Sequence, residues 1–266
     1  RAKSTSEKLK LASKIRPRHL APAIPKNGEP RTHMSMGQHC EITTKRWGIR
    51  REEQDELAYN SHKNLAAAYK SGFFNDLVVP FNRLERDNLL RPDIAQEKLA
   101  QLSPAFDRKS GLGTLTAGNS SALTDGASTV LLASEEWAKE NNLPVQAYLT
   151  FYETAAVDFI AKDEEDPEGL LMAPVYAISN MLKRANLSLQ DFDYYEIHEA
   201  FAAVVLATLK ALDDERFCQD KLGVPNKFGV IDKNKLNVVG SSIAVGHPFA
   251  ATGGRIVATL AKLLEQ

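Results

Sequence analysis

The chain has 266 residues, of which 43% are hydrophobic and 25% are charged, and its formal net charge is −1. This composition is typical of a globular protein with one large or two small domains, and the near-neutral charge argues against partners recognised by overall charge, such as nucleic acid. The sequence contains no apolar run close to the roughly 18 residues of a membrane span. Two cysteines in a chain of this size do not indicate a disulfide framework, so we expect reduced thiols and a cytoplasmic or organellar interior.

Residues 1–32 are basic, with nine Lys or Arg against two Glu, and four prolines interrupt them. Such a stretch is typical of a solvated, irregular segment. The alternative is a patch that binds a phosphate-bearing ligand, a partner subunit or a membrane surface. Neutralising its cations distinguishes the two, and the residues to change are Lys8, Lys10, Lys14, Arg16 and Arg18.

Residues 50–71 are the clearest predicted helix, because apolar side chains recur along one stripe and Gly72 is suited to end the helix. Residues 73–80 alternate weakly and predict a short strand. Cys40 lies in a short segment rich in methionine and is interpreted as an inert, structural thiol, with a catalytic thiol as the alternative. We expect residues 34–106 to be mostly helical and to form a lid or cap.

Asp93 and Gln96 have the spacing of a capping box, which predicts a helix that runs to about Leu102. Residues 111–125 are rich in Gly, Ser and Thr. They predict a strand at 114–117, a turn, and then a helix centred on Val130, Leu131 and Leu132. Strand, small-residue turn and helix is an arrangement that presents backbone N–H groups to a polar ligand.

The rest of the chain alternates strands with helices, which indicates α/β architecture with helices layered on a sheet. The predicted strands are residues 146–154, 191–197 and 236–239. The predicted helices are residues 174–185, with Val175, Ile178, Met181 and Leu182 inward, an apolar helix from about Glu199, and a last helix that ends at Gln266. Residues 213–235 are polar and predict a surface loop.

Two histidines occupy equivalent places in this pattern. His198 ends a predicted strand, and His247 follows another strand in a small-residue turn, between Gly246 and Pro248. Ligands bind at the carboxyl ends of strands in open α/β sheets, and a histidine with a near-neutral pKa can act as a base. Each histidine alone is compatible with a structural role, but the pair favours a site. Glu199 either orients a neighbour or only begins a helix as a favourable acid.

Several motifs in order resemble the thiolase family. They are MGQHCE at 36–41, the helix region at 49–74, TAGNSSALTDGAS at 116–128, HEAF at 198–201 and GHPFAATG at 246–253. HEAF, GHPFAATG and the 213–235 insertion look most like the acetyl-CoA C-acyltransferase and 3-ketoacyl-CoA thiolase branch related to the trifunctional-enzyme β subunit. Many other thiolases carry Asn at the position of His198.

The resemblance implies an α/β, thiolase-like layered α/β/α fold with a helical loop domain and an incomplete N-terminal half. The implied domains are a loop domain at 1–110, the end of the N-terminal thiolase domain at 111–144, and a C-terminal thiolase domain at 145–266 without its last strands. The implied activity is CoA-dependent cleavage of 3-ketoacyl-CoA, or the reverse Claisen condensation. Coenzyme A and acyl-CoA would be substrates, with no bound cofactor or metal. A homodimer or tetramer, and possible association with a hydratase/dehydrogenase subunit, are also implied.

By resemblance, His247 activates a nucleophilic cysteine and contributes to an oxyanion hole, and His198 positions a water or donor for a second oxyanion. The substrate- and CoA-binding positions implied in the same way are Met36, Ala117, Ser121, Ala200, Phe201 and Gly246.

The family's nucleophilic cysteine lies upstream of all these motifs, and its second cysteine lies in a C-x-G turn downstream. Cys40 and Cys218 match neither position. We therefore expect a chain that is truncated at both ends and that lacks the thiols for turnover. The alternative is a non-catalytic acyl-CoA- or lipid-binding relative that has lost them. The complete reading frame distinguishes these two hypotheses.

Overall fold

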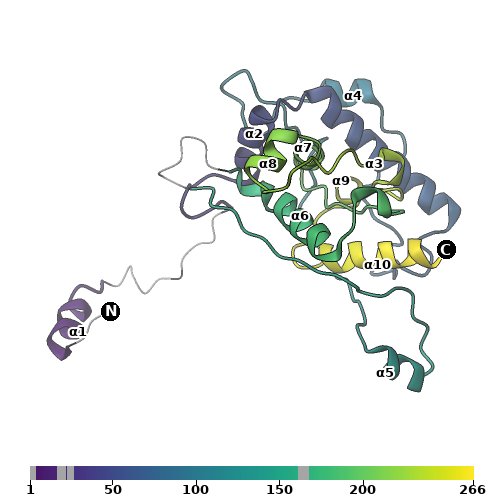
Figure 1. Ribbon diagram of the computed structural model, residues 1–266. Helices are drawn as coiled ribbons and strands as arrows, with labels where there is room; N and C mark the ends of the chain where they lie inside the picture. Colours follow the sequence, from purple (N-terminus) through teal and green to yellow (C-terminus); the bar gives the residue numbers. More distant parts are fainter. Residues whose placement is uncertain (1–3, 17–21, 23–26, 161–167) are drawn as a thin grey trace. The chain divides into compact units, whose positions relative to one another are not determined.

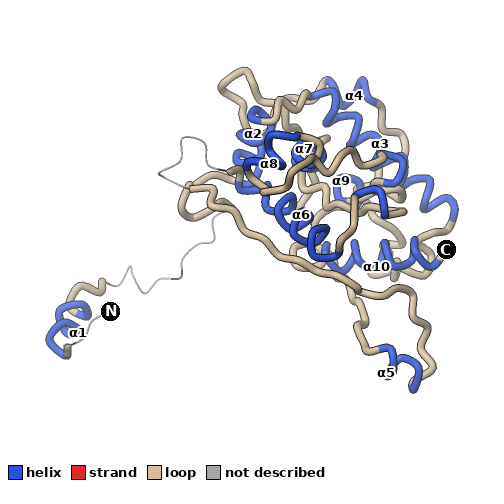
Figure 2. The backbone as a smooth tube through the Cα atoms, viewed as in Figure 1, coloured by secondary structure: helices blue, strands red, loops and turns tan. Residues whose placement is uncertain are grey.

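A computed structural model of the chain describes residues 4–16, 22, 27–160 and 168–266. The chain divides into two compact units, Arg1–Met36 and Gly37–Gln266. Helices and loops make up the described residues, and none of them is assigned to a paired strand (Figure 2). Within these residues, no helix combines the length and the apolar character that crossing a bilayer requires.

The first unit contains one helix, α1 (Thr5–Ala12), which has no buried residues. Ser4 and Glu7 form a capping box, in which each side chain accepts the other residue's backbone N–H. The expectation of a solvated segment is met here, but the expectation of irregular chain is wrong for these residues. Part of the predicted basic segment, including Arg18, lies outside the described residues.

The second unit is built from helices joined by long loops (Figure 1). Its α-helices run from α2 to α10, and α2 begins at Met36, the last residue of the first unit. Their bounds are Met36–Arg46 (α2), Arg51–Ser71 (α3), Gln96–Ala100 (α4), Glu135–Glu140 (α5), Ala173–Ala185 (α6), Ala202–Leu212 (α7), Glu215–Asp220 (α8), Ser242–Val245 (α9) and Thr252–Glu265 (α10). Short 3₁₀ turns lie at Leu170–Met172, Leu189–Asp191 and Lys233–Lys235.

Helix α7 lies at the centre of the largest apolar cluster and packs against α3, α6 and α8. Most of its residues are buried, and its many alanines let neighbouring helices approach closely. Helix α6 was predicted nearly to its bounds, and its Val175 and Leu182 are buried against this cluster as expected. The apolar face of α6 therefore follows directly from the 3.6-residue period.

Helix α3 ends at Gly72 as predicted, because Gly72 adopts the left-handed conformation (φ 81°) that a side chain disfavours. Its buried face is unusual in being partly polar. Gln54, Asp55, Ser61 and His62 are buried there beside apolar Leu65. Buried polar groups require partners, so α3 can fix the loops that cross it by hydrogen bonds as well as by packing.

The predicted strands at 191–197 and 236–239 meet at a single parallel bridge between Tyr195 and Leu236. Pairing ends there because the side chain of Asn237 takes the next backbone groups: its Oδ1 accepts the N–H of Ile197, and its Nδ2 donates to the Ile197 carbonyl. Asn237 itself has φ of 49°, which is incompatible with a continuing strand.

The predicted strands at 73–80 and 114–117 also fail to pair. The first is a series of turns after Gly72, in which Leu77 and Val78 both donate to the carbonyl of Phe74. In the second, the carboxylate of Glu41 accepts the backbone N–H groups of residues 114 and 115. A side chain thus replaces the ladder partner.

Residues 146–154 have no regular secondary structure and are exposed apart from Glu153, and none of the described residues pairs with them as a second strand. The helix predicted around Val130, Leu131 and Leu132 is wrong, since these residues are extended and solvent-exposed. The helix begins only at α5, because Ser134 supplies the N-cap by accepting the N–H of Trp137.

Three smaller expectations also need correction. Helix α4 exists, but Ala95 is its N-cap, so Asp93 and Gln96 do not form a capping box. Helix α7 begins at Ala202 and not near Glu199, because Phe201 is extended. Residues 213–235 are more than a surface loop, since they contain α8 and bury three side chains in the main cluster: Cys218, Leu222 and Ile231.

Candidate active site

The two predicted histidines lie against each other. The ring centroids of His198 and His247 are 4.3 Å apart, with 47° between the ring planes. His198 precedes α7, and His247 precedes α10. Both rings are half-buried. Two turns that are 49 positions apart in the sequence therefore bring their imidazoles into contact. This agrees with the prediction of one site, which rested on each histidine lying between a predicted strand and a helix.

The small-residue segment before Asp125 links the two turns. Ser121 donates from its backbone N–H (2.9 Å) and from its Oγ (3.0 Å) to the carbonyl of Ala200. The N–H of His247 donates to the carbonyl of Ala122 at 2.8 Å. This segment thus lies between the two histidine turns and fixes their separation. The Ser121 hydroxyl and N–H and the Ala122 carbonyl are engaged in these contacts.

The Nδ1 of His198 lies 2.6 Å from the Oγ of Ser242, on α9. Burial, followed by the proximity of His247 and Arg255, lowers the pKa of His198 to about 4. An imidazole in this environment is neutral at physiological pH. His198 therefore meets the site as a neutral hydrogen-bonding group and not as a cation.

The Nδ1 of His247 lies 2.7 Å from the Oγ1 of Thr252, in the first turn of α10. Burial, and then the positive charge of Arg255, lower the pKa of His247 as well. The ring of Phe249 lies edge-on at 4.9 Å and covers part of the imidazole. A neutral imidazole held at Nδ1 leaves Nε2 for proton transfer, which is the requirement for a base.

Gly246 makes room for this turn. Its φ is 107°, a conformation that other residues rarely adopt, and a Cβ placed there would lie 2.7 Å from Thr124 and 2.9 Å from Leu89. The glycine is needed for both its backbone conformation and its lack of a side chain. Its contribution to a substrate site is a prediction that these contacts leave open.

Glu199 is fully buried between α3 and α9 and accepts three hydrogen bonds, one from a backbone group. The donors are the Oγ of Ser61 (2.7 Å), the Nδ2 of Asn237 (2.7 Å) and the N–H of Ile243 (3.1 Å). Desolvation nevertheless raises the pKa of Glu199. Of the two interpretations of this residue, the first is correct: it orients neighbouring segments, and it does not lie in a helix.

A cavity of about 450 Å³ lies beside the histidine centre, between α4, residues 117–122 and the start of α9. Ala117, a predicted binding residue, lines it together with Ala122 and Ile243, which contact the histidine turns. Its other walls combine leucines with charged side chains: Leu89, Leu99, Leu102, Arg91, Lys98 and Asp93. An apolar passage with charge near its walls suits a long, flexible ligand with an anionic end.

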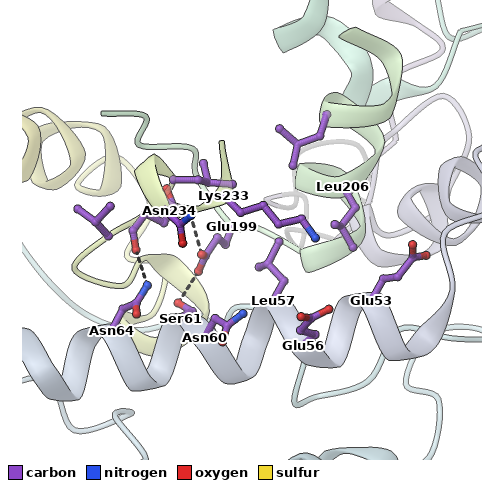
Figure 3. Close-up of a pocket in the computed structure, with 14 residues that line it drawn as sticks. Glu53, Glu56, Leu57, Asn60, Ser61, Asn64, Glu199, Leu206, Lys233 and Asn234 are labelled. Atoms are coloured by element: carbon purple, nitrogen blue, oxygen red, sulfur yellow. Dashed lines mark hydrogen bonds between the residues drawn. The ribbon is translucent and has the colours of Figure 1, made fainter. Parts of the chain in front are cut away.

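A second cavity of about 450 Å³ lies between α3, α7 and residues 233–238 (Figure 3). The picture shows acid and amide side chains of α3, among them Glu53, Glu56 and Asn60, facing Lys233 and Leu206. Glu199 forms part of its wall, but neither histidine lines it. Sequence reasoning did not predict this cavity, because its walls come from three segments without a motif.

The other predicted binding residues are placed differently. Met36 belongs to the first unit, so it is not located relative to the histidines. Phe201 is buried, with its ring edge-on to Phe106 at 5.6 Å, and it supports the turn from inside. Ala200 accepts the hydrogen bonds of Ser121 through its carbonyl. The roles of these residues toward a ligand remain predictions.

Neither cysteine is suited to be the nucleophile. Cys40 and Cys218 are both buried. Desolvation raises the pKa of each thiol, which disfavours the reactive thiolate. The sulfur of Cys40 contacts the Oγ1 of Thr44, and that of Cys218 faces the end of α7. Both behave as core residues, in agreement with the interpretation of Cys40.

Residues 21–136 match the thiolase N-terminal domain, and residues 151–266 match the thiolase C-terminal domain. The chain belongs to the thiolase family. The 3-ketoacyl-CoA thiolase of Klebsiella pneumoniae is 43% identical over 263 residues, covering 97% of this chain and 58% of that protein. The 3-ketoacyl-CoA thiolase of Photobacterium profundum is 42% identical over 272 residues, covering 100% of this chain and 60% of that protein. The chain thus spans about three-fifths of the length of these thiolases.

Solved thiolase structures agree. The Bacillus anthracis acetyl-CoA acetyltransferase aligns with a TM-score of 0.73 and 36% identity, covering 90% of this chain and 56% of that one. Human mitochondrial 3-ketoacyl-CoA thiolase in complex with CoA aligns with a TM-score of 0.73 and 32% identity, covering 90% and 54%. The predicted family and its thiolase-like α/β fold are confirmed. Paired strands are nevertheless absent from the described residues, where the predicted strand segments run as extended chain, turns or single bridges.

Sequence reasoning missed three residues around the thiolase histidines. Ser242 and Thr252 hold one imidazole each, and Arg255 lies behind both. Their signal in the sequence was membership of the small-residue stretch that leads into the last helix and includes its first turn. The sequence alone does not distinguish a serine that contacts a histidine ring from one that only provides a small side chain.

Proposed function

We propose that the complete protein containing these residues is a thiolase-type acyltransferase. It would cleave 3-ketoacyl-CoA with free CoA to acetyl-CoA and a shortened acyl-CoA, or run the reverse Claisen condensation. The observation that carries the proposal is the neutral histidine pair with ring centroids 4.3 Å apart. The names of the related proteins support the same chemistry.

In this proposal His247 is the base. It takes the proton of a cysteine thiol, and the thiolate attacks the 3-keto carbon. The carbon–carbon bond then breaks: the acyl group stays on that cysteine as a thioester, and acetyl-CoA leaves as its enolate, which takes a proton at its α-carbon from a second acid, the role of the family's second cysteine. Free CoA then attacks the thioester and releases the shortened acyl-CoA. The cysteine would come from outside the 266 residues, because Cys40 and Cys218 are buried in the core. His198 supplies an N–H toward an oxyanion.

The cavity that Ala117 lines is the proposed path of the pantetheine arm. Its leucines would contact the arm, and Arg91 and Lys98 would lie near the phosphates of CoA. Ser121 and Ala200 would shape the inner end of the path, and Phe201 would support it from the core. Homo-oligomer formation and a hydratase/dehydrogenase partner are retained as proposals that follow from the family alone.

The alternative is a non-catalytic acyl-CoA- or lipid-binding relative, which the two buried thiols favour. A single experiment separates the two. The complete natural polypeptide is incubated with a 3-ketoacyl-CoA and CoA, and the products are separated by chromatography. Formation of acetyl-CoA together with the acyl-CoA two carbons shorter supports the acyltransferase. Binding of the substrate without either product supports the binding protein.

A further inference from the structure

Arg255, on α10, lies in a buried polar cluster behind the histidine pair. Its Nη2 donates to the Oγ of Ser242 at 2.8 Å, and its Nη1 lies 3.6 Å from Oε1 of Glu196. Glu196 also accepts the hydroxyl of Ser241 at 2.6 Å. The side chain of Arg255 is 18% exposed and that of Glu196 is 1% exposed. The acid therefore fixes the guanidinium that faces Ser242.

The hydrogen-bond roles at Ser242 follow from counting protons. A hydroxyl donates once and accepts up to twice. Arg255 can only donate, so Ser242 accepts from it. Among the described residues, the partner left for the Ser242 proton is the Nδ1 of His198, at 2.6 Å. The reverse arrangement, with a proton on Nδ1, would leave the fully buried Ser242 hydroxyl without an acceptor, which is costly.

We propose that Arg255 and Ser242 hold His198 in the neutral tautomer that carries its proton on Nε2. His198 then presents a fixed N–H donor toward His247 and the site, and it does not act as a base. The charged and titratable groups near its ring keep it neutral or are engaged by other partners. Arg255 and His247 disfavour the doubly protonated, cationic ring, so His198 stays neutral, and the hydrogen bonds at Ser242 then select the nitrogen that carries the proton. Oε1 of Glu196 accepts from Ser241, and Glu199 accepts from Ser61 and Asn237.

The second histidine is held in the opposite way. The Oγ1 of Thr252 donates to the carbonyl of Pro248, so it can accept a hydrogen bond from the Nδ1–H of His247. Nε2 of His247 is then unprotonated. His198 offers an N–H donor at Nε2, and His247 offers an acceptor at Nε2. The hydroxyls of Ser242 and Thr252, which bind the two Nδ1 atoms in opposite senses, determine these roles. A site that must hold an oxyanion while it moves a proton needs both functions.

Nuclear magnetic resonance of the full-length protein labelled with ¹⁵N-histidine tests the assignment without reference to activity. The long-range nitrogen–proton couplings of His198, assigned by comparison with His198→Asn, report which nitrogen carries the proton. The expected result is the Nε2–H tautomer in the wild type and its loss, or a mixture of tautomers, in Ser242→Ala. Arg255→Lys, which removes the forked donor and keeps the charge, is expected to shift the same signals part of the way.

Ser179→Ala is the matched control, because Ser179 is a buried serine on α6 whose Oγ has no hydrogen-bond partner among the described residues. It should leave the His198 signals unchanged. Ser242→Thr retains the hydroxyl and should restore the wild-type tautomer. An Nδ1–H tautomer in the wild type, or an unchanged tautomer in folded Ser242→Ala, overturns the inference.

A kinetic arm rests on the proposed acyltransferase function. If His198 is a positioned donor, Ser242→Ala should lower kcat about 10- to 100-fold with little change in KM, and Ser242→Thr should recover most of it. An unchanged kcat with a lost Nε2–H tautomer would contradict a role for the tautomer in catalysis. A wild-type protein without turnover contradicts the proposed function and leaves the resonance result to decide the inference.

Discussion

The Oγ of Ser61, on α3, lies 2.7 Å from Oε2 of Glu199 and 3.1 Å from the backbone nitrogen of Ser241. One hydroxyl thus donates to the turn that carries His198 and accepts from the segment that leads to His247. The same helix holds Asn237 through Asn64 and residue 119 through Asp55. Helix α3 is therefore the support on which the loops of the histidine centre are fixed.

Ser61→Ala should destabilise the protein by about 1–3 kcal/mol, because it removes a donor to a buried carboxylate and leaves a buried N–H without a partner. Urea unfolding followed by circular dichroism measures the change. Ser71→Ala on the same helix is the control, since the one partner of the Ser71 hydroxyl within the described part of the chain is the nearby carbonyl of Ala68. Equal stabilities for the two variants would mean that Ser61 does not support the turns.

Gly240→Ala and Gly111→Ala form a second matched pair. Both glycines have positive φ, 78° and 75°, but a Cβ at Gly240 would lie 2.5 Å from the carbonyl oxygen of Ser61, whereas nothing lies within 4 Å at Gly111. Gly111→Ala should cost about 1 kcal/mol through backbone strain alone. Gly240→Ala should cost several times more or prevent folding, measured by thermal unfolding. Similar costs would argue against the close packing of α3 on this loop.

Asp55→Ala should loosen the segment that joins the histidine turns. Asp55 accepts the side-chain N–H of Asn119 at 2.9 Å and pairs with Arg51 at 2.7 Å. Losing a buried, paired charge typically costs about 3–5 kcal/mol. Hydrogen exchange should show faster exchange of the N–H of residue 116, which bonds to Asn119. The exposed Glu52→Ala on the same helix is the control, and its exchange rates should match the wild type.

The depressed pKa of His198 predicts a pH dependence of stability. Its pKa falls from 6.5 in the unfolded chain to about 4 in the fold, so the folded state binds fewer protons between these values. Its contribution to stability is fully present above pH 6.5 and is lost as the pH falls through 4. Allowing for partial solvent exposure, the wild type should lose roughly 2 kcal/mol more than His198→Asn between pH 7 and pH 4.

The comparison with a variant is needed because Glu196 acts in the opposite sense. Burial raises the pKa of Glu196 to about 7, so its contribution declines as the pH rises from 4.5 toward 7. Both proteins share this effect, and it cancels in the difference. Parallel pH profiles for the wild type and His198→Asn would show that the ring is not desolvated.

Much of the helical scaffold was predictable, because period and caps are local. The stripe of α3 with its terminal Gly72, and the inward face of α6, needed only neighbouring residues. The strands were not predictable in the same way, because strand pairing depends on residues that are distant in the sequence. The side chains of Asn237 and Glu41 bind backbone N–H groups that a β-ladder would use, and no sequence pattern around either residue indicates this.

The site shows the same division. The equivalence of His198 and His247 was visible from their small-residue neighbours and their places before helices. Their separation, and the hydroxyl that each Nδ1 contacts, depend on Ser242 and Thr252, which the pattern does not distinguish from spacers. The second cavity, along α3, arises only when three segments come together.

The most direct test of the account is the thiolysis rate of His247→Asn in the complete natural polypeptide. His33→Asn is the control, because it makes the same chemical change at an exposed histidine in the first unit. The account predicts that kcat for cleavage of a 3-ketoacyl-CoA by CoA falls by about 10²- to 10⁴-fold in His247→Asn. It predicts a rate within about twofold of the wild type in His33→Asn. A His247→Asn protein that is folded and cleaves its substrate at the wild-type rate would contradict the assignment of His247 as the base.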